Sequence, residues 1–215
     1  MREGEKSPTY SLMISEEFMI CIGTDADDSF LKKLAGKYSE AGYVTQIHSG
    51  SKTPSDIFLA VSTANKNGCN VFIAPIDDMG IIKYDLMIFL DKGKNKVMLP
   101  LINIKAGGYL IINTDDNTTF PFLIPDGVNI VTCGINSRSA LTFSGINVNI
   151  NGRETIQCCV QKNIRTFSGR IIEPQEFSVN ILGKYKISEV LAIIAAVIMG
   201  DIEETVTSEE LFFSK

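Results

Sequence analysis

An acidic loop follows the first apolar run of the sequence. The run EFMICIG ends at Gly23, and residues 23–29 (GTDADDS) hold Asp25, Asp27 and Asp28 but no lysine. In α/β proteins such a loop, between a first strand and a helix, is where phosphates bind, because the helix N-terminus offers free N–H groups and a partial positive charge. Like charges about 4 Å apart repel by roughly 1 to 4 kcal/mol, which disfavours a phosphate here. We expect the carboxylates to cap the helix instead, and a Mg²⁺ or Ca²⁺ site built from them is the alternative.

The pair Lys52 and Thr53 is a second candidate for ligand contact. Thr53 precedes Pro54 and has Asp56 three positions later, which is the pattern of a helix N-cap. A capped helix start beside a lysine could receive an anionic group such as a diphosphate. A plain N-cap without a ligand is the simpler interpretation.

The remaining reactive side chains indicate no catalytic residue and no metal site. His48 is the only histidine and stands beside Ser49, but no Ser or Cys nucleophile with a partner can be placed near it from the sequence, so we expect a surface loop histidine. Cys158 and Cys159 are adjacent, so on a strand they face opposite sides and cannot chelate one ion. Asp115 and Asp116 follow an apolar run, where Asp favours a turn.

Composition excludes several classes of protein. The chain has 215 residues, 45% of them apolar and 21% charged, with a net charge of -5, which fits one globular domain and gives no reason to expect nucleic acid. The longest apolar stretch, residues 187–199, is shorter than the roughly 20 residues that span a membrane. Five cysteines without a CxxC pair indicate reduced core residues. With no secretory signal in the first residues, we expect a cytoplasmic protein without a membrane partner.

Hydrophobic periodicity predicts an α/β fold with a doubly wound, mostly parallel sheet and flanking helices. Residues 1–16 are expected to form a tail or an edge element, and residues 17–215 a single α/β domain. Short strands with Gly and Asn turns from Ser139 onward predict an antiparallel flap or small second sheet. The first helix is expected to have Asp28 or Ser29 as its N-cap and to stop at Gly42. The predicted buried strands are 17–23, 70–75, 85–90, 109–113 and 129–134, and the predicted helices are 29–41, 53–67 and 187–199.

Several segments in order resemble the Mur ligases, the ATP-dependent amide ligases of peptidoglycan assembly. MICIGTDADDSFLKKLAGKYSEAGY is similar to that family's strand, phosphate loop and helix, and keeps Gly23 and Thr24. KTP at 52–54 resembles a TTP segment, and YLIINTDD and NIVTCGIN resemble a pair of central-domain strands. FSVNILGKYKISEVLAIIAAVIMGDI resembles the last strand, glycine turn and Ala-rich helix of that domain. The resemblance implies a P-loop NTPase-like central domain, with Gly23 and Thr24 as the remnant of the phosphate loop.

The sequence departs from that family where the nucleotide and its metal would bind. Asp27 and Asp28 stand where the family has the lysine and threonine that hold the ATP phosphates and Mg²⁺. The family's magnesium-binding glutamate has no counterpart unless Asp77 or Asp78 serves.

Three further departures from the family also affect the site for nucleotide and substrate. The family's Asp-His motif is missing, and His48 falls elsewhere. Lys186 and Glu189 replace asparagines that help to place adenine. The sequence ends soon after the Ala-rich helix, so we expect no counterpart of the family's C-terminal domain.

These departures predict a degenerate, non-catalytic Mur-ligase-like protein with a binding or regulatory role and no cofactor. Candidate partners are a cell-wall precursor at Lys52 and Thr53, another protein, or a second copy of the chain. The alternative is an ATP- and Mg²⁺-dependent amide ligase that uses an unusual site or a partner chain. The apolar residues 211–213 could dock to such a chain or fold back on the core.

Overall fold

The structure is a computed structural model that describes residues 19–50, 53–76, 82–90, 103–115, 124–148, 154–182, 185–202 and 211–212. Within these residues the chain forms three helices and twelve strands. In order they are β1 (Ile20–Thr24), α1 (Asp28–Glu40), β2 (Thr45–Ile47), α2 (Pro54–Lys66), β3 (Val71–Pro75), β4 (Tyr84–Phe89), β5 (Ile104–Asn113), β6 (Asn129–Cys133), β7 (Leu141–Val148), β8 (Glu154–Val160), β9 (Ile164–Arg165), β10 (Ile171–Ile172), β11 (Gln175–Leu182), α3 (Ile187–Met199) and β12 (Leu211–Phe212).

A ten-stranded sheet organises the molecule, in the order β12-β11-β8-β7-β6-β5-β4-β1-β3-β2. Of the strand pairs that the structure describes in this sheet, only β7–β8 and β8–β11 are antiparallel, so the predicted mostly parallel sheet is confirmed. The antiparallel strands expected after Ser139 are present, but β7, β8 and β11 extend the main sheet. The separate small sheet consists of β9 and β10 alone. The apolar residues 211 and 212 pair with the end of β11, whereas Phe213 lies outside the described residues.

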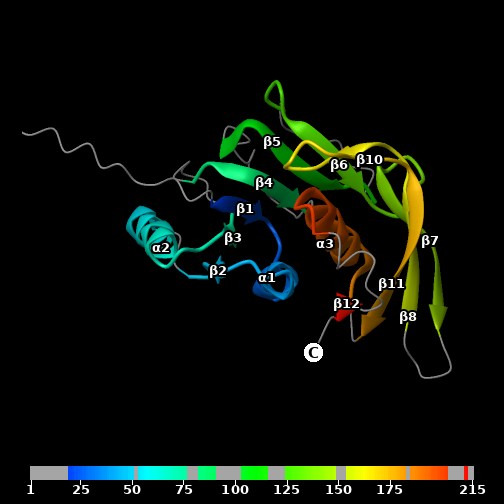
Figure 1. Cartoon of the computed structure of the whole chain (residues 1–215), viewed down its shortest axis with the longest axis horizontal. Coiled ribbons are helices and arrows are strands. Elements are labelled where there is room, and N and C mark those ends of the chain that lie inside the picture. The colour runs from blue at the N-terminus through cyan, green and yellow to red at the C-terminus, as the bar shows by residue number, and fades with distance from the viewer. Residues whose placement is uncertain are drawn as a thin grey trace, which may run out of the picture.

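Helices cover both faces of the sheet, as a doubly wound fold requires. Along the sheet, the chain moves outward from β1 to the edge strand β2 and then back inward to β3. Because both crossovers are right-handed and run in opposite directions, α1 and α2 lie on opposite faces. The larger core joins α1 and α3 to one face, and the smaller core joins α2 to the other. Figure 1 shows the sheet arching over α3, with α1 beside α3 and α2 apart from both.

Helix α3 is the centre of the larger core. Every residue from Val190 to Met199 is buried, as expected for a helix that is apolar on all sides. Tyr38 of α1, itself fully buried, donates a hydrogen bond to the Ala196 carbonyl at 2.9 Å. A Cβ atom on Gly200 would lie 3.0 Å from the Tyr38 hydroxyl, so the glycine lets the two helices approach.

In the described residues no helix is long and apolar enough to span a membrane.

The helix ends follow the local sequence with one correction. The first helix is capped by Asp27 and not by Asp28 or Ser29, because the Asp27 carboxylate accepts from the Phe30 N–H at 3.1 Å. Its stop is as predicted, with Gly42 at a φ of 87° that favours glycine. Thr53 caps α2 as predicted, accepting from the Asp56 N–H at 3.3 Å.

Candidate ligand-binding site at the carboxyl edge of the sheet

The direction of winding changes at β1, which lies between β3 and β4 in the sheet. The connection through α1 leads to the β3 side, whereas β4, β5 and β6 continue on the other side. In open α/β sheets ligands bind in the crevice outside the carboxyl ends of the strands at such a switch point. The loop that follows β1 is therefore the first place to search for a site.

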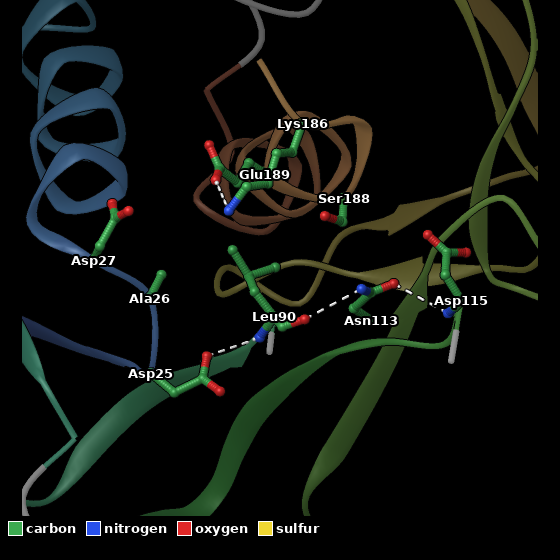
Figure 2. A pocket seen from close by; sticks show the side chains of 9 residues that line it. All are labelled: Asp25, Ala26, Asp27, Leu90, Asn113, Asp115, Lys186, Ser188 and Glu189. Carbon is green, nitrogen blue, oxygen red and sulfur yellow. Dashed lines mark hydrogen bonds and ion pairs between the residues drawn. The ribbon is translucent and has the colours of Figure 1, made fainter. Parts of the chain in front are cut away.

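A pocket of about 570 Å³ lies at this position. It is formed by the loop after β1, the ends of β4 and β5, and the first turn of α3. Figure 2 shows the start of α3 facing the strand ends, with Asp27 and Asp115 on opposite sides. The lining residues are Asp25, Ala26, Asp27, Leu90, Asn113, Asp115, Lys186, Ser188 and Glu189.

The loop between β1 and α1 uses its own side chains to satisfy its backbone. The Thr24 hydroxyl accepts from the Ala26 N–H at 3.1 Å, and the Asp27 carboxylate caps α1. Asp25 Oδ1 accepts from the Leu90 N–H at 2.8 Å and so ties the loop to the end of β4. The N–H of Asp25 donates to the Ile88 carbonyl at 3.2 Å. These bonds tie the loop to the end of β4 and to the start of α1.

Asn113 joins the ends of β4 and β5 on the floor of the pocket. Its Nδ2 donates to the Leu90 carbonyl at 3.2 Å, and its Oδ1 accepts from the Asp115 N–H at 3.1 Å. The Asp115 carboxylate in turn accepts from the Ile135 N–H. Figure 2 shows this series of contacts running from Asp25 through Leu90 and Asn113 to Asp115. Asp115 follows β5 as predicted, but its carboxylate bonds to the backbone of the distant Ile135 and not to a local turn, and Asp116 lies outside the described residues.

The first turn of α3 forms the opposite wall. Its N-cap is Lys186, which makes no side-chain capping hydrogen bond. Glu189 pairs with Lys33 of α1 at 3.2 Å and with Lys186 at 3.3 Å. The Glu189 and Lys33 side chains are 12% and 17% exposed, so this contact links α1 to α3 at a largely buried position.

The pocket is acidic. Four of its lining residues carry carboxylates, against one lysine, Lys186. The Cys133 thiol lies near Asp115, and burial together with the Asp115 charge raises its pKa well above the usual range. Cys133 is therefore not a thiolate nucleophile at neutral pH. The site offers carboxylates, the Lys186 ammonium and a serine hydroxyl for binding.

The carboxylates do not converge on a metal position. In the parts of the chain that the structure describes, no three His, Cys, Asp or Glu side chains gather to hold an ion. Asp25 and Asp27, two of the three carboxylates in the loop, instead accept hydrogen bonds from the backbone N–H groups of Leu90 and Phe30. Asp77 and Asp78, the other candidates for magnesium, lie outside the described residues.

Gly23 and Thr24 lie at the end of β1, next to the pocket but not in its lining. A Cβ atom on Gly23 would come within 2.8 Å of the Tyr84 ring, so packing alone requires a glycine there. Thr24 is fully buried. Their role as the remnant of a phosphate loop remains a prediction.

Thr53 is the N-cap of α2, and this helix packs on the other face of the sheet from α1 and α3. Its hydroxyl donates to the Asp56 carboxylate at 2.6 Å, and it does not line the pocket. Lys52 lies outside the described residues. The structure thus does not bring Thr53 together with Gly23 and Thr24, and ligand contact at Lys52 and Thr53 stays a prediction.

The sequence did not identify Asn113, Leu90 and Ser188 as lining residues. Asn113 carried a usable signal, because it is the first polar residue after a buried run and so stands at a strand's carboxyl end. Leu90 takes part through its backbone, which leaves no trace in the side-chain pattern. Cys158 and Cys159 lie on opposite faces of β8, as predicted, but only Cys158 is a buried core residue, since Cys159 is partly exposed.

No protein-family model matches the sequence, and no curated protein matches it. Solved structures do match. A crystal structure of MurF from Acinetobacter baumannii gives a TM-score of 0.59 at 12% identity, covering 89% of this chain and 45% of that one. MurF ligase from Thermotoga maritima in complex with ADP gives 0.56 at 12% identity, covering 87% and 46%. An FPGS–AMPPCP–folate complex gives 0.52 at 10% identity, covering 86% and 59%.

These likenesses establish the fold. The resemblance to Mur ligases predicted from the sequence is confirmed at that level, and FPGS shares the architecture. The chain spans just under half the length of the MurF chains that it matches.

Proposed function

We propose that this chain is a Mur-ligase-like binding protein that uses its acidic pocket without ATP-dependent ligation. The observation that carries the proposal is the start of α1. There the Asp27 carboxylate accepts a hydrogen bond from the Phe30 N–H, and a phosphate at this helix start would need the same donor.

Electrostatics strengthens this argument. A phosphate at the start of α1 would have to displace the Asp27 carboxylate, giving up a cap worth about 1 kcal/mol. It would also sit near Asp25 and Asp27, with a repulsion of roughly 1 to 4 kcal/mol for each charge about 4 Å away. No lysine of the lining lies on this side, since Lys186 belongs to α3.

The lining suggests how a ligand would be oriented. A cationic or hydrogen-bond-donating group suits the carboxylates at the ends of β1 and β5. An anionic group suits Lys186 and Ser188 in the first turn of α3, where it would compete with Glu189 for the Lys186 ammonium. A cell-wall precursor is one candidate ligand, because the fold is shared with MurF. In this role the protein would bind or regulate and would need no cofactor.

An ATP-dependent amide ligase of the Mur type is the second candidate function. Two observations favour it: the pocket lies at the switch point of the sheet, and two structures with this fold are complexes with ADP and AMPPCP. Such an enzyme would use ATP and Mg²⁺ and would draw the missing groups from an unusual site or a partner chain.

Calorimetric titration with ATP and Mg²⁺ separates the two functions. The test compares the wild type with the double variant Asp27→Lys, Asp28→Thr, which places a lysine and a threonine where the family has them. Asp27→Asn is the matched control, because it retains a good N-cap and removes one charge. We expect no binding by the wild type at millimolar ATP and measurable binding by the double variant. Magnesium-dependent binding by the wild type would support the ligase instead.

A further inference from the structure

Strand β7 has a backbone edge without a partner among the described residues. Its pairing with β6 is a single residue pair, Cys133 with Leu141. On its other side β7 pairs with β8 along its whole length, from Leu141 to Val148. Residues 142–148 therefore continue beyond the end of β6 with one edge open, and Figure 1 shows β7 and β8 extending away from the body of the sheet.

This open edge carries no charge. From Ser139 to Gly152 the sequence SALTFSGINVNING has no Asp, Glu, Lys or Arg, although 21% of the chain is charged. Proteins usually protect an edge strand from pairing with charged side chains or proline. Within the described part of this edge, residues 141–148, the protective feature is a bulge between Phe143 and Gly145, and the stretch from Gly145 to Val148 stays in regular register with β8.

A row of aliphatic side chains ends at this edge. Val179 of β11 lies opposite Ile156 of β8, and Ile156 lies opposite Ile146 of β7. The first two side chains are 2% and 0% exposed, whereas Ile146 is 43% exposed and Val148, two residues further along the same face, is 66% exposed. The larger core thus continues across three strands and becomes solvent-exposed where β7 has no neighbour.

We propose that β7 pairs antiparallel with β7 of a second copy of this chain, about a two-fold axis that passes beside Asn147. In this register Ile146 lies opposite the partner's Val148, and Val148 opposite the partner's Ile146. The row of aliphatic side chains then continues into the second subunit through two symmetric pairs on one face. Asn147 meets the partner's Asn147 on the other face.

Two features favour a second copy over a different protein as the occupant. In a two-fold pairing any charge on the segment would enter the interface twice, once from each copy, and this segment has none. The spacing of Ile146 and Val148 also makes the edge complementary to itself, since each fills the position opposite the other. The interface is small, so we expect a dimer that forms at high protein concentration.

Sedimentation velocity of the whole chain between roughly 10 μM and 1 mM tests the proposal. The wild type is expected to shift from monomer to dimer over this range, and Ile146→Lys to weaken association by roughly tenfold or more. The control is Ile171→Lys, because Ile171 is similarly exposed at 49% but lies on β10. A wild type that stays monomeric at the highest concentration overturns the proposal, as does a dimer that Ile146→Lys leaves intact.

A disulfide tests the register. Asn147→Cys in a Cys159→Ser background should form a linked dimer under a mild oxidant, because a two-fold pairing about Asn147 brings the two new thiols opposite each other. Ile171→Cys in the same background should stay monomeric. Linked dimer from Ile171→Cys alone, or none from Asn147→Cys, contradicts the proposed pairing.

Discussion

The two helices that begin at the pocket differ in how their N-termini are capped and in which side chains lie beside them. Helix α1 starts with the Asp27 carboxylate accepting a backbone N–H, whereas α3 starts at Lys186 with no side-chain capping bond. Both ends carry the partial positive charge of a helix N-terminus. At the first start the Asp27 carboxylate is the capping group, whereas the second has Ser188 and Lys186 beside it, with the Glu189 carboxylate paired to Lys186. The comparison teaches that the side chains beside a helix N-terminus decide which ligand charge it favours, since the two helix starts share a backbone geometry and differ in those side chains.

The largest effect is expected at Glu189, which connects the two helix starts. Glu189→Gln replaces the ion pair with Lys33, a charge-assisted hydrogen bond at a largely buried position, and such bonds contribute about 1.5 to 3 kcal/mol. Urea denaturation should show a loss of this size. The control is Glu173→Gln, since Glu173 is exposed. Equal unfolding free energies for the two variants would mean that the ion pair between α1 and α3 does not stabilise the fold.

Removing the cap of α1 should have the next largest effect. Asp27→Ala leaves the Phe30 N–H without its acceptor, which typically lowers the unfolding free energy by about 1 kcal/mol. Asp27→Asn should cost little, because asparagine caps nearly as well. The same denaturation measurement checks both. If alanine and asparagine proved equally stable, the cap would not be what fixes the carboxylate in place.

The far end of α3 provides a pH test. Burial alone would raise the pKa of Asp201, but hydrogen bonds from Thr166 and Ser168 and the charge of Arg170 outweigh it and lower the pKa. A lowered pKa in the folded state gives stability that is present above the unfolded pKa of about 3.9 and is lost as the pH falls through the folded pKa.

Asp201→Asn removes that titration and keeps a residue that tolerates the observed φ of 58°. We expect the wild type to be more stable than this variant by up to about 1 kcal/mol at pH 7. The difference should shrink as the pH falls below about 4. The measurement is the unfolding free energy of both proteins between pH 3 and 7. A difference that stays constant over that range would contradict a stabilising role for the Asp201 charge.

Lys186→Ala should have the smallest effect. Lys186 makes no capping hydrogen bond. It forms an ion pair with Glu189, but the Lys186 side chain is 76% exposed. Exposed pairs of this kind contribute about 0 to 1 kcal/mol. A loss as large as that of Asp27→Ala would mean that the two helix starts do not differ as described.

Local sequence pattern predicted most of the elements because their causes are local. Helix α3 has the predicted bounds, and the start of α2 follows from Thr53 and Pro54. The cap of α1 was misplaced by one residue, since three carboxylates stand in a row of four positions and any of them suits a cap.

The parts that sequence alone did not give depend on contacts between distant residues. Pattern showed strands after Ser139, but the order that joins β7, β8 and β11 to the main sheet is set by pairing between segments far apart. Gly23 illustrates the same limit. Its neighbour is the Tyr84 ring, 61 positions later, so the glycine has a packing reason that the resemblance to a phosphate loop concealed.

The most direct test of the central claim is the unfolding free energy of the wild type with and without about 5 mM ATP and Mg²⁺. A ligand present at 100 times its Kd stabilises the folded state by about 2.7 kcal/mol, so even a Kd near 50 μM would be detected. Closure of the α1 N-terminus by Asp27 predicts no change in stability. A magnesium-dependent increase of 1 kcal/mol or more, of the order that millimolar affinity gives, would show that the pocket still accepts the nucleotide and would contradict the account.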